Sequence, residues 1–214
     1  MAQLLEQIRM WAEQLVSAMG YVGIALLMFL ENIFPPIPSE VIMPFAGSLV
    51  SKGELNFVGA LAAGTVGALF GVVAIYYIGI AISHDRAKQW FDRYGQYFLL
   101  SEDDFNQAMD KFDRHGPIMV LVGRLMPAIR SLISLPAGLN GMGLVKFLVY
   151  TAIGTTIWNL ILLGAGFYLG SNWEQVLQFV DTYETVFWVI LGLVVAYYIF
   201  RRVKAQSGSS SDYA

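Results

Sequence analysis

Two arginines occur inside an otherwise apolar, proline-containing segment of this chain. Arg124 and Arg130 lie on either side of Pro127. A guanidinium group stays charged, and its fork of N–H donors matches the oxygens of a phosphate. A charge within an apolar, helix-broken segment is costly and by default indicates function. The pair therefore predicts a site for a phosphate headgroup. Structural ion pairs with nearby acids are the alternative, and the two interpretations are compatible.

Two acids accompany a second apolar segment that is rich in proline. Glu31 and Glu40 lie on either side of Pro35, Pro36 and Pro38, and Ser39 is a candidate N-cap for the helix that follows. A carboxylate in a low-dielectric site is a candidate for reversible protonation, whereas a nearby arginine stabilises its charged form. The sequence therefore predicts that the two acids either exchange protons or form ion pairs with the arginines.

Little else in the sequence is suited to catalysis. The chain has no cysteine, and its two histidines, His84 and His115, lack the spacing of metal ligands. No glycine-rich phosphate loop ending in Lys-Ser or Lys-Thr occurs. The net charge of −3 does not favour nucleic acid as a partner. We therefore expect no catalytic residues, no metal and no cofactor, and we do not expect an enzyme.

The composition indicates a membrane protein. Hydrophobic residues make up 57% of the chain and charged residues only 14%, whereas about 25% is typical of a soluble domain. Residues 55–83 and 147–173 contain no Asp, Glu, Lys, Arg or His, and a spanning helix needs roughly 20 such residues. A third apolar run, 185–200, has aromatic and basic residues at its ends. These runs predict an all-α integral membrane protein with long transmembrane helices.

Around these spans the sequence predicts two re-entrant, broken-helix hairpins, each too short to cross the membrane fully. The predicted breaks are Pro35, Pro36, Pro38, Pro127 and Pro136. We expect an amphipathic N-terminal helix at 1–19, followed by a first repeat with its hairpin at 20–51 and its transmembrane helix at 55–83. A cytoplasmic amphipathic segment at 84–116 leads to the second repeat, with its hairpin at 117–142 and its transmembrane helix at 144–170. A C-terminal transmembrane helix at 173–203 and a disordered tail at 204–214 complete the expected order.

The two halves, 20–83 and 117–172, are similar to each other. An offset of 91 residues aligns Pro36 with Pro127 and Ala46-Gly47 with Ala137-Gly138. Basic residues place segment 84–116 and the C-terminus in the cytoplasm by the positive-inside rule. The hairpins then enter from opposite faces, an inverted repeat typical of transporters. This layout puts the N-terminus outside; the alternative is a full crossing by 11–34 with the N-terminus inside.

Two motifs, FLENIFPPIPSEVIMPFAG at 29–47 and GRLMPAIRSLISLPAGLNGM at 123–142, resemble the DedA family of membrane proteins. Phe147, Gly154, Trp158 and Gly170 fit the same resemblance, which covers residues 20–172. It implies a VTT-type fold with two oppositely entering hairpins in the bacterial plasma membrane. It also implies lipid transport, with undecaprenyl phosphate as the lipid of several members and phospholipids as that of others.

The resemblance places the family's functional acids on Glu31 and Glu40 and its functional arginines on Arg124 and Arg130. Many members have Pro-Gly-Asp where this chain has Pro-Ser-Glu, so the partner of Glu40 is open. The leading expectation is a proton-coupled translocase of undecaprenyl phosphate, with a membrane lipid and protons as partners. A translocase or scramblase of a phospholipid such as phosphatidylethanolamine is the first alternative. A structural or regulatory membrane protein, whose ion pairs only hold the hairpins together, is the second.

Overall fold

The computed structural model describes residues 2–34, 39–82, 102–126 and 129–177, and single residues between 179 and 196. All regular structure in this part of the chain is helical. The α-helices are α1 (Ala2–Met19), α2 (Tyr21–Ile33), α3 (Ser39–Ser51), α4 (Phe57–Ile82), α6 (Glu102–Arg124), α7 (Ser134–Leu139) and α8 (Leu144–Leu169), and a 3-10 turn, η2 (Gly170–Asn172), follows α8.

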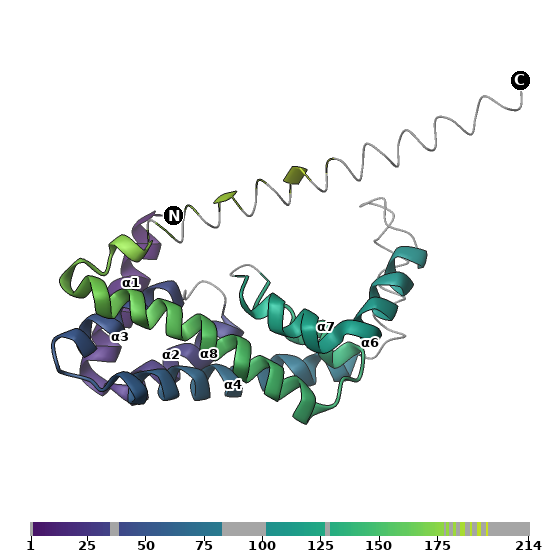
Figure 1. Cartoon of the computed structure of the whole chain (residues 1–214), viewed down its shortest axis with the longest axis horizontal. Coiled ribbons are helices and arrows are strands. Elements are labelled where there is room, and N and C mark those ends of the chain that lie inside the picture. The colour runs from purple at the N-terminus through teal and green to yellow at the C-terminus, as the bar shows by residue number, and fades with distance from the viewer. Residues whose placement is uncertain are drawn as a thin grey trace, which may run out of the picture.

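The two long apolar helices, α4 and α8, form the centre of the fold and run antiparallel (Figure 1). Each has 26 residues, which at about 1.5 Å per residue is enough to cross a bilayer core of roughly 30 Å. Phe57 near the start of α4 contacts Phe167 near the end of α8, with 6.0 Å between ring centroids. At the opposite end, Tyr76 stacks on Phe147 at 4.8 Å. Both helices are long and apolar enough to cross a membrane.

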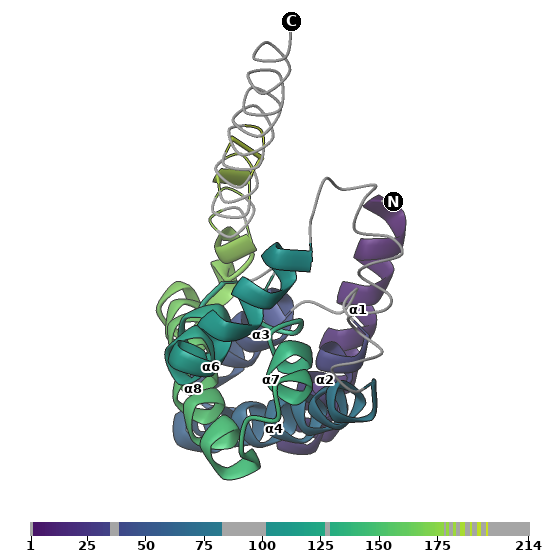
Figure 2. The same ribbon diagram turned by 90° about the vertical axis from the view of Figure 1, so that its right-hand side faces the viewer.

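The shorter helices pack on these spans in the same way in both halves of the chain. α2 packs on α4 and α6 on α8, whereas α3 packs on α8 and α7 on α4 (Figures 1 and 2). At Gly47 of α3, a Cβ would lie 2.2 Å from the carbonyl oxygen of Leu163 in α8. At Gly138 of α7, a Cβ would lie 2.1 Å from the carbonyl oxygen of Tyr76 in α4. Each half therefore packs its short helix on the long helix of the other half, and the two glycines are those aligned by the sequence repeat.

A matched pair of glycine substitutions in α8 tests this close packing. At Gly166 a Cβ would lie 2.1 Å from the backbone oxygen of Pro44 in α3, whereas at Gly164 it would meet nothing within 4 Å. We expect Gly166→Ala to destabilise the protein by about 1–3 kcal/mol through overpacking. Gly164→Ala should leave the thermal unfolding midpoint in detergent unchanged or slightly raised. Equal midpoints for the two variants would contradict the α3–α8 contact.

The N-terminal helix α1 is part of the folded body. Ala12 and Val16 are buried in the same apolar cluster as residues of α2 and α3. Arg9 donates to Glu174, just beyond η2, at 2.9 Å, and also pairs with Glu13 at 3.5 Å. Trp11 stays exposed. The predicted amphipathic helix is therefore present, and Ala12 and Val16 of its apolar face pack on protein.

The second hairpin differs from its predicted form in two places. Helix α6 continues through Pro117, so the expected boundary between residues 116 and 117 falls inside a helix. The prediction of a break at Pro136 is wrong, because Pro136 lies within α7. The first N–H groups of a helix have no intrahelical acceptor, so proline is tolerated there. The other predicted breaks (Pro35, Pro36, Pro38 and Pro127), residues 83–101 and most of the predicted C-terminal span lie outside the described residues.

Candidate functional site

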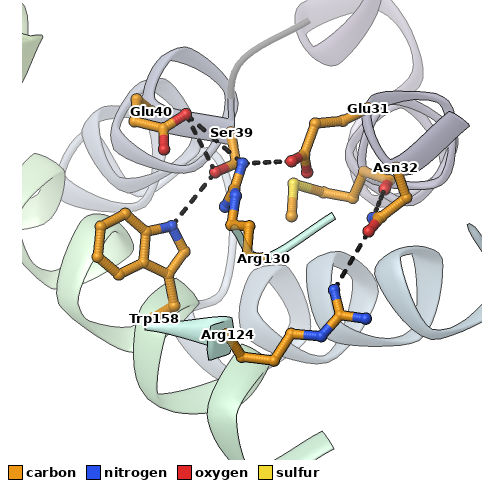
Figure 3. A network of polar contacts seen from close by, with 8 residues as sticks. Glu31, Asn32, Ser39, Glu40, Arg124, Arg130 and Trp158 are labelled. Carbon is orange, nitrogen blue, oxygen red and sulfur yellow. Dashed lines mark hydrogen bonds and ion pairs between the residues drawn. The ribbon is translucent and has the colours of Figure 1, made fainter. Parts of the chain in front are cut away.

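The four ionisable residues singled out from the sequence converge on one buried cluster (Figure 3). Glu31 comes from the end of α2, Glu40 from the start of α3, Arg124 from the end of α6 and Arg130 from the turn between α6 and α7. Their exposed fractions are only 4%, 6%, 3% and 8%. The two helix pairs therefore each bring a pair of charges of one sign to a common point beside α8.

Arg130 lies at the centre of the ion pairs. Its Nη2 donates to Glu31 Oε1 and lies 3.5 Å from Glu40 Oε2. Its guanidinium carbon is 5.8 Å from the ring centroid of Trp158 in α8, a distance at which a cation is attracted to the face of an aromatic ring. Both acids and one aromatic ring thus hold Arg130 in place.

Arg124, by contrast, has neutral partners. Its Nη2 donates to Ser134 Oγ at 2.6 Å, and its Nη1 donates to Asn32 Oδ1 at 3.4 Å. The amide of Asn32 is oriented by a second bond, from its Nδ2 to the backbone oxygen of Met28 at 2.9 Å. Arg124 Nε is buried without a hydrogen-bond partner, and no carboxylate of the described residues pairs with this guanidinium.

The cluster is therefore balanced in total charge but uneven in its distribution. Two carboxylates face Arg130, and none of those described pairs with Arg124. The interpretation in which each arginine is neutralised by its own acid does not describe this arrangement. A buried charge without a charged partner is unfavourable because it has lost its hydration. Arg124 is thus the group in the cluster best prepared to receive an added anion.

Ser39 joins the acids to α8. Its Oγ donates to Glu40 Oε2 and accepts from Trp158 Nε1, both at 3.4 Å. Ser39 is the first residue of α3, yet both of these bonds go to side chains, whereas a capping role would use a backbone N–H of the helix. Ser39 and Ser134 were missed as site residues. The sequence signal for both was a small polar residue close to a predicted charge, one position before Glu40 and four after Arg130.

A small cavity lies within the cluster. Its lining residues come from α2, α4, α6, α8 and the turn before α7, and they are Met28, Glu31, Asn32, Ala68, Arg124, Arg130, Thr155 and Trp158. Its volume is about 10 Å³, which is roughly the space that one water molecule requires. A phosphate group does not fit there, so this conformation is closed to a headgroup.

The residues considered for other chemistry lie elsewhere. His115 is exposed on α6 and does not line the cavity, and His84 is outside the described residues. Within the described ranges, no group of three or more His, Cys, Asp or Glu side chains is arranged to hold a metal ion.

These features define a helical membrane protein with a buried arginine–carboxylate cluster. The VTT domain family matches residues 37–168, and the chain belongs to this family, also called DedA. An "alkaline phosphatase-like protein" of Lactococcus lactis subsp. lactis (strain IL1403) is 40% identical over 194 residues, which cover 90% of this chain and 91% of that relative.

Two further relatives are named for transport. "Undecaprenyl phosphate transporter A" of Staphylococcus aureus (strain NCTC 8325 / PS 47) is 34% identical, with coverage of 89% of this chain and 94% of the relative. The protein of the same name from Bacillus subtilis (strain 168) is 32% identical, with coverage of 92% and 94%. No solved structure gives a significant match.

Proposed function

We propose that this protein moves a phosphate-bearing lipid, with undecaprenyl phosphate as the first candidate, across the bacterial plasma membrane. The observation that carries the proposal is Arg124, a buried guanidinium whose hydrogen-bond partners, Asn32 and Ser134, are neutral. A phosphate supplies the missing negative charge and accepts from the planar fork of donors. The names of the two transporter relatives support the choice of lipid.

The uneven pairing suggests an order of events. A phosphate would bind Arg124 first and then compete with Glu31 and Glu40 for Arg130. Each carboxylate displaced from Arg130 would be left buried without its partner, a state that favours proton uptake. Phosphate binding would in this way drive proton binding, and this exchange is our hypothesis for proton coupling. The closed cavity of about 10 Å³ implies that the helix pairs separate before the headgroup enters.

In this proposal, the two inverted halves of the chain move against each other during transport. The pair α2–α3 would enter from the outer face and the pair α6–α7 from the cytoplasmic face, with segment 84–116 and the C-terminus in the cytoplasm. The equivalent packing of Gly47 on α8 and Gly138 on α4 supports two related halves. Rocking of one half against the other would then open the cluster to either face in turn, as in other transporters built from repeats.

A competition assay in proteoliposomes tests the choice of lipid. We expect purified protein to move labelled undecaprenyl phosphate between leaflets, and excess unlabelled undecaprenyl phosphate to inhibit this movement. An equal excess of phosphatidylethanolamine should have little effect. Inhibition by phosphatidylethanolamine, or movement of that lipid at the same rate, would favour the phospholipid translocase or scramblase instead.

A second candidate function comes from the name of the Lactococcus lactis relative. Release of inorganic phosphate from undecaprenyl phosphate by the purified protein, measured in the same vesicles, would establish a phosphatase and contradict a pure transporter. A structural or regulatory role makes a different prediction. If the ion pairs only hold the hairpins together, the combined variant Glu31→Gln, Glu40→Gln and Arg130→Met, which removes them without leaving an unpaired charge, should retain full function.

A further inference from the structure

An apolar groove begins where the charged cluster ends. It runs along one face of the second half of α8, from Trp158 past Ile161 and Ala165 to Tyr168. These positions recur at helical spacing. Val176 and Phe179, after the turn that follows α8, form the opposite wall. The volume is about 440 Å³, within the roughly 300–1,000 Å³ of small-molecule sites.

Trp158 belongs to both the groove and the charged cluster. It lines the small polar cavity and also lines the groove. Its Nε1 donates to Ser39 Oγ on the polar side, and its ring lies beside the Arg130 guanidinium. An indole suits this position because it combines a large apolar ring with a single polar N–H. Figure 3 shows Trp158 beside Arg130 and Ser39 on the polar side, and the groove lies on its other side.

The groove occupies a different face of α8 from the one that packs on protein. Leu163 and Gly166 face α3, whereas Ile161 and Tyr168 are 56% and 89% exposed. From Trp158 to Leu169 the helix rises about 16 Å, at 1.5 Å per residue. The groove therefore extends from the middle of α8 to its end, with the charged cluster at its inner limit.

We propose that this groove holds the first part of the isoprenoid tail of the transported lipid while its phosphate is in the arginine cluster. This inference rests on the proposed function and adds a tail site to it. A charged cluster next to an apolar groove fits a molecule with an anionic headgroup and an apolar tail. An inorganic phosphate has no tail and would leave the groove empty. Trp158 would then lie at the junction between the headgroup and the tail of the bound lipid.

A matched pair of substitutions on α8 tests the groove. Ile161→Trp fills it, whereas Ile153→Trp places the same bulk at another exposed isoleucine of α8, outside the groove. In proteoliposomes we expect Ile161→Trp to slow transport of undecaprenyl phosphate at least about tenfold, since one extra group in an apolar pocket has effects of this size. Transport of geranyl phosphate should fall as well, because its short tail corresponds to the first part of the isoprenoid chain and passes Ile161. Ile153→Trp should resemble the wild type with both lipids.

The outcomes separate this inference from the proposed function. Equal transport rates for Ile161→Trp and Ile153→Trp, whether unchanged or equally reduced, would reject the groove as the tail site. The proposal that the protein transports a lipid would still stand. A shift of Ile161→Trp to a smaller oligomer, without a loss of undecaprenyl phosphate transport, would assign the groove to a second copy of the chain and overturn the tail site. Failure of the wild type to move either prenyl phosphate would reject the proposed function itself, and the tail site with it.

Discussion

Arg124→Ala should abolish most lipid transport while the protein still folds. The guanidinium would contribute charge-assisted bonds to the phosphate, and truncation of such a partner costs about 2–5 kcal/mol, or at least about thirtyfold in rate. Folding should tolerate the change because the hydrogen-bond partners of Arg124 are neutral, so its removal leaves no buried carboxylate newly unpaired. The measurement is the rate of undecaprenyl phosphate movement in proteoliposomes, together with the elution profile and the unfolding midpoint of the variant.

The control for this variant lies on the same helix. Arg114 is exposed on α6, so Arg114→Ala removes the same charge at a distance of ten positions from the cluster and should transport normally. Arg124→Lys keeps the charge and loses the planar fork, so its rate should lie between those of the wild type and Arg124→Ala. A wild-type rate for Arg124→Ala would contradict the role of Arg124 as the phosphate site.

Arg130→Ala should have the larger effect on stability. Its removal leaves Glu31 and Glu40 buried and facing each other without their shared cation. Breaking a buried pair in this way is strongly destabilising, by about 3–5 kcal/mol. We expect a fall of the thermal unfolding midpoint in detergent that clearly exceeds that of Arg124→Ala.

A double substitution identifies the cause of this loss. Adding Glu31→Gln to Arg130→Ala removes one of the two orphaned charges and should restore part of the midpoint, although Glu31→Gln alone lowers it. This non-additivity is the mark of residues that interact directly. Additive effects of the two substitutions, or an Arg130→Ala variant as stable as the wild type, would contradict the ion-pair geometry.

The convergence of Glu31, Glu40, Arg124 and Arg130 could be anticipated from the sequence as a hypothesis, because charges are rare in apolar segments and costly there without partners. The pairing of the individual acids and arginines could not be anticipated in this way. Which acid meets which arginine depends on how α2, α3, α6 and the turn before α7 cross, and hydropathy contains no information on those crossings. The sequence therefore left one-to-one pairing open, whereas the structure gives both acids to Arg130.

The spans and the short helices of the first half were predictable to within a few residues. α4 and α8 follow the two uncharged runs, and α2 and α3 flank the proline cluster as expected. The helix boundaries of the second half were harder to predict because the effect of a proline depends on its position in the helix. It breaks a helix interior but is tolerated in the first turn, so Pro136 could not be placed without knowing where α7 begins. Ser39 and Trp158 meet only in three dimensions, from positions far apart in the chain.

The most direct test of the account is to identify the lipid that co-purifies with the protein, by extraction and mass spectrometry, for the wild type, Arg124→Ala and Arg114→Ala. The account predicts a polyprenyl phosphate with the wild type and with Arg114→Ala, and its loss from Arg124→Ala. The same polyprenyl phosphate in equal amount with all three proteins would contradict the claim that the buried arginine cluster binds the phosphate.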